Sequence, residues 1–336
     1  MNDSDNATAS TRLIRWAPWA LAAAAFGVYW TTLSRGAFPG LPAKSLTWHL
    51  GLDASPTLLE SLWGFIVRAL PGSDPAFWAG LLSAVCGAAG VGLVATLMMR
   101  VRYAIHDAHD PDEVRREVQA RVLAGVSAGL FTAASIPFWI LSTRSLPGTF
   151  HLLLLLGAAR LFSEYQRTGK TSRLYLLGLL YGVGLTEFAT MWVFAPLAAA
   201  LVVRAMLQRA EFNARVLVRT GLCLVPGLLL YVVNGVRLAQ DPAVQLRGFQ
   251  SAATVIWYVW RDQWHLIVNA PQTSGFLLIM ALTVVPWVVM YLLRNKKPAW
   301  RYSAWQTFLR LWCWPRRWRR CSTCRCRLGT SSAWAI

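Results

Sequence analysis

Residues 34–74 read SRGAFPGLPAKSLTWHLGLDASPTLLESLWGFIVRALPGSD and separate the first two long apolar runs of the chain. Within this stretch, residues 57–70 carry apolar side chains at helical spacing, with the carboxyl group of Glu60 among the few polar ones. A helix of this length is too short to cross about 30 Å of hydrocarbon, and its apolar face suits the membrane interface. We therefore expect an interfacial helix that starts after Pro56 and stops before Pro71.

The composition of the whole chain excludes an ordinary soluble domain. Of its 336 residues, 56% are hydrophobic and only 14% are charged, so too little polar surface exists to cover a globule. The formal net charge of +18 comes from basic residues clustered between apolar runs, where they orient membrane spans. We expect membrane lipid as a partner and no nucleic acid. The six cysteines show no paired arrangement typical of a disulfide framework.

The apolar runs predict an all-α membrane protein with about eight transmembrane helices. Several runs are short for a bilayer, and Pro137 is expected to break the third. The expected spans are residues 16–33, 77–99, 122–141, 149–162, 174–185, 191–203, 216–233 and 276–293.

The distribution of basic residues predicts the orientation of these spans. Most of the 33 Lys and Arg residues fall on the side that also holds the N-terminus. The positive-inside rule places that side in the cytoplasm, so residues 34–76 and 234–275 are expected to form two outer loops. Residues 1–13 are then a cytoplasmic tail, polar and expected to be disordered over residues 1–11, and residues 14–298 form the membrane domain. We expect a multi-pass protein of the bacterial inner membrane with an uncleaved signal anchor.

Residues 299–336 form a basic tail rich in Trp and Cys, for which three explanations remain open. The tail is translated out of frame, or it lies at the membrane interface, or the cysteines at 321, 324 and 326 bind a metal. We favour the out-of-frame explanation, because no histidine is near to complete a zinc site. Asp110 and Asp112 resemble a metal-binding pair but equally resemble the start of a helix. We expect no metal and no cofactor, since no nucleotide-binding loop is present either.

Three segments resemble a large family of bacterial membrane proteins of unknown function. They are ASPTLLESLWGFIVRALPGSDPAFWAGLLSAVCGAAGVGLVATLMM at residues 54–99, GLFTAASIPFWILSTRSLPGTFHLLLLLGAARLF at 129–162, and residues 174–197 with the pattern Gly-x-Gly-Leu-Thr. The core of this family is similar to the C-type glycosyltransferase fold and is related to protein O-mannosyltransferases. The resemblance covers about residues 14–235 and rests on packing and turn patterns.

The resemblance implies transfer of a sugar from a polyprenyl phosphate at the outer face of the membrane. In such enzymes an acid of the first outer loop acts as general base for the acceptor hydroxyl. Here residues 40–45 read GLPAKS and contain no acid, and the Asn-His pair of a later span is replaced by Glu187-Phe188. These departures leave open a degenerate, non-catalytic protein that kept a lipid-binding groove, or a transporter or flippase of lipid-linked material.

Five polar residues remain as candidates for a site on the outer face. We predict Asp53 as the general base, with His49 sharing that role, and Arg144 as a partner of the lipid phosphate. Glu60 and Glu187 are further candidates for substrate binding. The alternatives are that Asp53 caps a turn, that Arg144 only ends a span, and that both glutamates are simply solvated.

Overall fold

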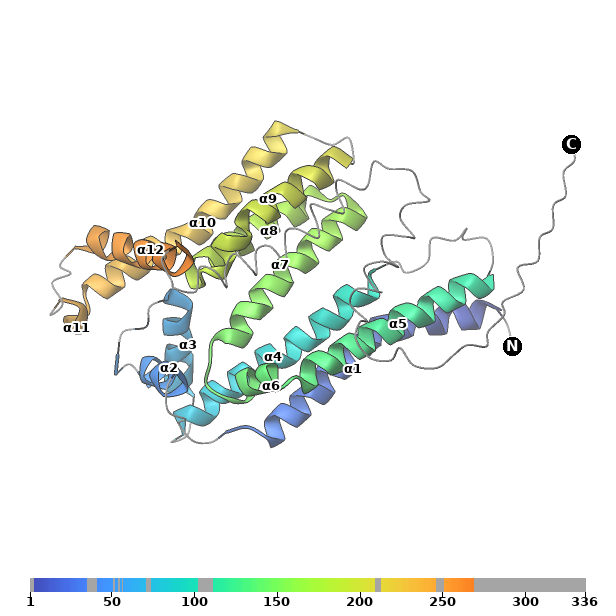
Figure 1. Ribbon diagram of the computed structural model, residues 1–336, viewed down its shortest axis with the longest axis horizontal. Helices are drawn as coiled ribbons and strands as arrows, with labels where there is room; N and C mark the ends of the chain where they lie inside the picture. Colours follow the sequence, from blue (N-terminus) through green and yellow to red (C-terminus); the bar gives the residue numbers. More distant parts are fainter. Residues whose placement is uncertain are drawn as a thin grey trace, which may run out of the picture. The chain divides into compact units, whose positions relative to one another are not determined.

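The computed structural model describes residues 3–34, 41–50, 52–53, 55, 57–70, 74–101, 111–208, 213–245 and 251–268, and the regular structure in this part of the chain is helical (Figure 1). The expected last span at residues 276–293, the tail at 299–336 and Asp110 lie outside the described residues. The helices are α1 (Asp3–Thr31), α2 (Leu41–Leu50), α3 (Leu58–Ala69), α4 (Pro75–Met99), α5 (Pro111–Ala134), α6 (Ile136–Thr143), α7 (Gly148–Thr168), α8 (Thr171–Glu187), α9 (Thr190–Gln208), α10 (Ala214–Ala239), α11 (Pro242–Gln245) and α12 (Ala252–Val268).

The helix boundaries follow local sequence signals. Pro75 occupies the first turn of α4, and the side chain of Asp74 accepts a hydrogen bond of 3.1 Å from the Phe77 amide, so it caps the helix. The interfacial helix expected at residues 57–70 is confirmed as a helix, α3. The expectation of disorder over residues 1–11 is wrong, because α1 already begins at Asp3.

Three of the described helices are long and apolar enough to cross a membrane, namely α4, α9 and α10. A fourth candidate is the pair α5 and α6, which bends by 65° at a break between Ala134 and Ile136. The break falls just before Pro137, because proline lacks an amide donor and its ring clashes with the backbone of the preceding helical turn. α8 has 17 residues, which corresponds to about 26 Å at 1.5 Å per residue. The expected total of eight spans remains a prediction.

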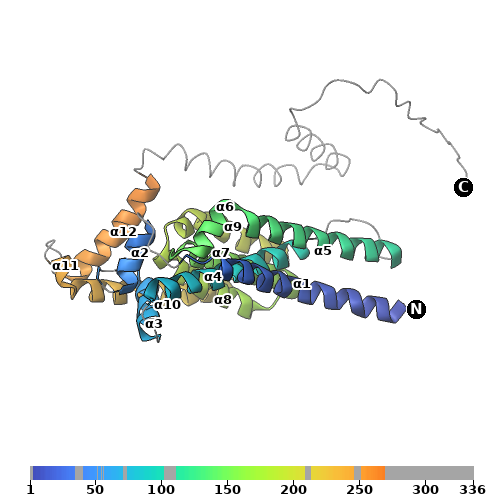
Figure 2. The same ribbon diagram turned by 90° about the horizontal axis from the view of Figure 1, so that it is seen from below.

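The contact between α8 and α10 is the most extensive in the described part and depends on glycine. A Cβ atom added at Gly182 of α8 would overlap the backbone carbonyl of Leu224 in α10. Gly227 of α10 faces the same turn of α8, so the two backbones touch without intervening side chains. Small residues allow this approach in lipid, where packing replaces the hydrophobic effect as the force that joins helices. α7 packs on the other side of α8 and on α4, which α1 and α5 also contact (Figures 1 and 2).

Segments far apart in sequence meet at one end of this bundle. Here α2 and α3 contact each other and α4, and α3 also contacts α10. The end of α1 joins the same region, since the Ser34 amide donates to the Thr143 carbonyl at 3.1 Å. We call this region the α3 end of the bundle, and Figure 1 shows α2 and α3 there beside the last turns of α10. The residues that the sequence places in outer loops therefore lie together.

Candidate functional site

Glu60 lies inside the α3 end of the bundle, in the first turn of α3. Its side chain is 6% exposed, and its Oε2 accepts a hydrogen bond of 3.1 Å from the Ser55 hydroxyl. The apolar residues Leu62, Phe65 and Ile66 of the same helix are exposed instead. The interpretation of Glu60 as a solvated residue is therefore wrong, because α3 turns Glu60 toward the protein and part of its apolar side outward. An outward apolar face is what a helix in contact with lipid requires.

Glu187 reaches the same place from the end of α8. It is 4% exposed, and its Oε1 accepts a hydrogen bond of 3.2 Å from the Leu59 amide in the first turn of α3. A carboxylate at a helix N-terminus satisfies an amide that has no partner within the helix. Its other oxygen is also buried, and the Thr57 hydroxyl lies near the carboxyl group. The interpretation of Glu187 as a group wetted at the interface is also wrong.

The two glutamates form a buried carboxyl pair on either side of the N-terminus of α3. Burial, helped by the nearby charge of Glu187, raises the pKa of Glu60 to about 7 against the lowering effect of the Ser55 hydroxyl. Burial likewise raises the pKa of Glu187 to about 7, opposed by the Thr57 hydroxyl and the Leu59 amide. Each group therefore exchanges its proton near neutral pH, where a general acid or base is most effective.

Arg237 of α10 brings a positive charge close to Glu60. Its guanidinium donates to the Ser61 hydroxyl and to the Ser55 carbonyl, on either side of Glu60. The positive charge also lowers the pKa of Glu60. The sequence analysis counted Arg237 only as an outer-side charge and missed this role. The sequence held a weak signal for this role, because Arg237 lies at the end of an apolar run and is followed by Leu-Ala-Gln-Asp. An arginine at such a place usually pairs with an acidic or polar group.

His49 faces the carboxyl pair from α2. It is 3% exposed, and its Nδ1 lies 3.2 Å from the Ser145 hydroxyl. Burial lowers its pKa to about 4, so the imidazole is neutral at pH 7. Gly64 of α3 allows this placement, because a Cβ at that position would lie 2.9 Å from the Cα of His49. Glycine is thus required where α2 crosses α3.

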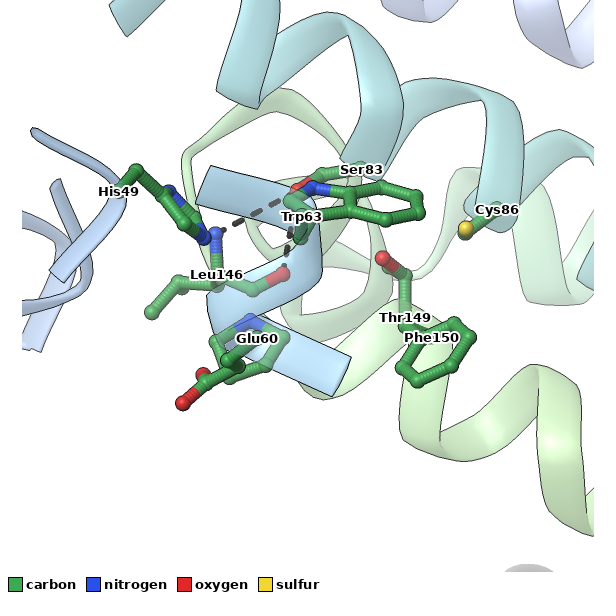
Figure 3. Close-up of a pocket in the computed structure, with 9 residues that line it drawn as sticks. His49, Glu60, Trp63, Ser83, Cys86, Leu146, Thr149 and Phe150 are labelled. Carbon is green, nitrogen blue, oxygen red and sulfur yellow. Dashed lines mark hydrogen bonds between the residues drawn. The ribbon is translucent and has the colours of Figure 1, made fainter. Parts of the chain in front are cut away.

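His49 and Glu60 both line a cavity of about 20 Å³ (Figure 3). Its volume corresponds to a single water molecule. The hydroxyls of Ser83 and Thr149 also line it, and the Thr149 hydroxyl is buried without a partner among the described residues. The cavity can therefore hold one water molecule, with the Ser83 and Thr149 hydroxyls among its possible hydrogen-bond partners.

Asp53 and Arg144, unlike His49 and Glu60, are not among the described residues that line the cavity. Asp53 lies half-buried in the connection between α2 and α3. Arg144 follows the last residue of α6 and is also half-buried. Of the five predicted site residues, the structure brings together His49, Glu60 and Glu187. In the part of the chain that the structure describes, no group of three or more His, Cys, Asp or Glu residues could hold a metal ion.

A large apolar groove extends to the last turn of α8, the helix that ends at Glu187. Its volume is about 680 Å³, and residues of α7, α8, α9 and α10 line it. Leu185 lines the groove and is two residues from Glu187. The carbonyl of Leu185 accepts hydrogen bonds from the Trp192 indole at 3.1 Å and the Tyr231 hydroxyl at 2.7 Å, which fixes this end of α8. An apolar tail in the groove would therefore reach the end of α8.

The segment that carries both glutamates matches a known family. Residues 57–211 match the family model of the protein O-mannosyl-transferase TMEM260 N-terminal domain. The match runs from the start of α3 past the end of α9, so it includes Glu60 and Glu187 but neither Asp53 nor His49. No curated protein and no solved structure matches the chain. The chain is thus a membrane protein that is similar to a glycosyltransferase over this segment.

Proposed function

We propose that this protein transfers a sugar from a polyprenyl-phosphate donor to a hydroxyl group at the outer face of the bacterial inner membrane. The observation that supports this most directly is the buried pair of Glu60 and Glu187, together with an apolar groove that extends to the last turn of α8. The groove suits a polyprenyl chain, and the carboxyl pair suits the proton transfer that activates a hydroxyl. Mannose is the sugar to test first, since the matched family is one of O-mannosyl-transferases.

In this proposal Glu60 is the general base. The oxygen of the acceptor hydroxyl forms a bond to C1 of the sugar, and the bond between C1 and the phosphate oxygen breaks. The hydroxyl proton passes to the carboxylate of Glu60, and the polyprenyl phosphate leaves with the bonding electrons. Glu187 fixes the N-terminus of α3 through the Leu59 amide and keeps Glu60 in place. The guanidinium groups of Arg237 and Arg144 are the candidates for holding the donor phosphate.

This assignment differs from the base predicted from the sequence. Glu60 is preferred over Asp53 because it is buried, has a pKa raised toward neutrality and shares a cavity with His49. His49 is neutral at pH 7 and bonded to Ser145, so it is better suited to orient a water or the acceptor than to remove a proton. The roles of Asp53 and of Arg144 remain open to direct test.

The test is transfer of radiolabelled mannose from polyprenyl-phosphate mannose to a serine-containing peptide by the full chain in proteoliposomes. Glu60→Gln should lower the rate by about 10² to 10⁴, the usual contribution of a general base. The matched control is Glu117→Gln, because Glu117 is a half-exposed residue of α5 paired with Arg121. Equal rates in Glu60→Gln and the control would remove Glu60 as the base.

The same assay separates the alternative functions. A chain that transfers no sugar but binds polyprenyl phosphate specifically would be the non-catalytic lipid-binding protein. Movement of the intact lipid-linked sugar between leaflets without transfer would identify a flippase. Either result would contradict the proposed transferase.

A further inference from the structure

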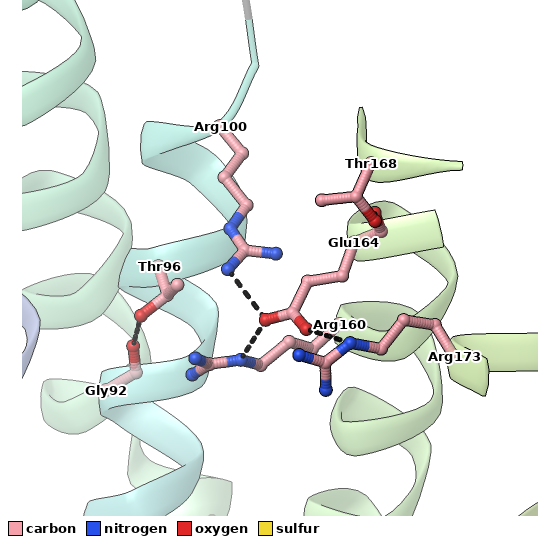
Figure 4. A network of polar contacts seen from close by, with 7 residues as sticks. All are labelled: Gly92, Thr96, Arg100, Arg160, Glu164, Thr168 and Arg173. Carbon is pink, nitrogen blue, oxygen red and sulfur yellow. Dashed lines mark hydrogen bonds and ion pairs between the residues drawn. The ribbon is translucent and has the colours of Figure 1, made fainter. Parts of the chain in front are cut away.

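A second polar cluster lies at the opposite ends of the helices that carry the site. Glu164 near the end of α7 accepts hydrogen bonds from Arg100 and Arg160 and forms an ion pair with Arg173 (Figure 4). Arg100 follows α4 and donates through Nη2 at 3.1 Å, and Arg160 of α7 donates through Nε at 3.2 Å. The Nε of Arg173 in α8 lies 3.3 Å from the other carboxylate oxygen. We call these four residues the Glu164 cluster.

The Glu164 cluster carries more positive than negative charge. Burial raises the pKa of Glu164, but the bonds from Arg100 and Arg160 and the charge of Arg173 outweigh it and hold the pKa below its usual value. The carboxyl group is therefore ionised at neutral pH. Three guanidinium groups around one carboxylate leave a net charge of about +2 at a single point.

The unused donors of the cluster are partly accessible. Arg160 and Arg173 each pair with Glu164 through Nε, and their side chains are 40% and 41% exposed. Figure 4 shows the terminal guanidinium nitrogens of Arg160 directed away from the carboxylate. Arg100 is more enclosed, and its Nη1 is buried without a hydrogen-bond partner among the described residues. A buried guanidinium donor without a partner is costly, so an acceptor from outside the protein would stabilise it.

The position of the cluster indicates the source of that acceptor. Arg100 directly follows α4, one of the helices able to cross a membrane. The cluster is therefore expected at the depth where lipid headgroups begin, and phosphate is the group that planar guanidinium donors bind best. The geometry points to a binding site for the phosphate of an anionic phospholipid headgroup at the Glu164 cluster. This inference is independent of the proposed transferase activity.

Such a site would also join three helices. The phosphate would neutralise the surplus charge of Arg100, Arg160 and Arg173, which come from α4, α7 and α8. An ion-pair network without a ligand would hold the same helices but leave the surplus charge unpaired. A lipid-phosphate site and an internal ion-pair network therefore predict opposite changes in phosphatidylglycerol binding when the charge of Glu164 is removed.

The experiment measures binding of short-chain phosphatidylglycerol and phosphatidylcholine to the detergent-solubilised full chain by native mass spectrometry. Each arginine near an anionic membrane surface strengthens lipid binding about fivefold. The double variant Arg160→Gln with Arg173→Gln should therefore weaken phosphatidylglycerol binding roughly 25-fold. Phosphatidylcholine binding should change little. The matched control is Arg215→Gln with Arg219→Gln, because these are exposed arginines of α10 outside the cluster. An equal loss in the control pair would overturn the proposal.

Glu164→Gln provides a test with the opposite sign. It removes the competing negative charge but keeps an acceptor oxygen, so phosphatidylglycerol should bind about fivefold more tightly. Weaker binding would show that the cluster is only an internal ion-pair network. Should the double arginine variant fail to fold, Arg160→Gln alone keeps the test, with a fivefold loss expected. Inorganic phosphate that displaces phosphatidylglycerol at equal concentration would overturn the lipid source while retaining the phosphate chemistry.

Discussion

Replacing Glu60 with glutamine should make the folded protein more stable in alkaline solution while it removes activity. Glutamine keeps an oxygen that can accept the hydrogen bond from the Ser55 hydroxyl. It removes a negative charge that is buried beside the carboxyl group of Glu187. A group placed for catalysis commonly costs stability, so the two effects are expected together.

The size of the effect follows from the pKa of Glu60. Burial raises it from 4.5 to about 7, so between these values the folded chain binds a proton that the unfolded chain has released. The free energy of unfolding therefore falls as the pH rises through this window, and the loss is complete above about pH 7. A rise of this size corresponds to about 3 kcal/mol. The cost is about 3 kcal/mol at pH 8 and below about 1 kcal/mol at pH 5.

The assay is thermal unfolding of the detergent-solubilised chain at pH 5 and pH 8. Glu60→Gln should raise Tm by several degrees at pH 8 and by a degree or two at pH 5, given a few degrees for each kcal/mol in a chain of this size. Glu117→Gln is the control and should change Tm little at either pH, since it breaks one half-exposed ion pair. A Tm change for Glu60→Gln that is the same at both pH values would refute the reasoning, because it would show that no buried charge is involved.

Three further predictions concern the base, the packing and the orientation. Asp53→Asn and His49→Ala should each keep transfer within about tenfold if Glu60 is the base, whereas a loss of 10² or more in Asp53→Asn would return that role to Asp53. Gly182→Ala should lower Tm and cost at least about 1–3 kcal/mol by overpacking against the Leu224 carbonyl, and an unchanged Tm would contradict the close contact. In a cysteine-free background, Asp53→Cys should react with an impermeant label from outside and Lys170→Cys from inside, and the reverse pattern would invert the orientation.

The helices could be predicted from the sequence wherever apolar runs end at strong local signals. Asp74 and Pro75 mark the start of α4, and Pro137 marks the bend between α5 and α6. These signals act over a few residues and do not depend on the rest of the fold. The α3 helix was also predictable, because its apolar spacing and flanking prolines are local.

The direction in which α3 faces could not be predicted. In water the apolar side of an amphipathic helix turns toward the protein, but beside a membrane both lipid and protein interior accept apolar groups. Leu62 and Phe65 are exposed and Glu60 is buried, which reverses the expectation for a soluble protein. Periodicity alone contains no information about which of the two apolar environments lies on which side.

Arg237 and Glu187 illustrate contacts that the sequence does not record. Arg237 lies 176 residues from its partner Ser61, and Glu187 lies 128 residues from its partner Leu59. Each was predicted to be at the outer side, but lying on one side of a membrane does not specify a neighbour. The glycine contact between α8 and α10 determines which residues meet, because it fixes how these two helices align.

The buried carboxyl pair bears on the choice between an active and a degenerate protein. Burying Glu60 and Glu187 side by side costs stability at neutral pH, since both pKa values are raised to about 7. A protein that had only to retain a lipid groove would be more stable with uncharged residues at these two positions. Residues that violate the rules of stable packing are expected mainly at functional sites. In the proposed mechanism the base is Glu60 of α3, fifteen residues beyond residue 45, so the absence of an acid in residues 40–45 does not require that the base was lost.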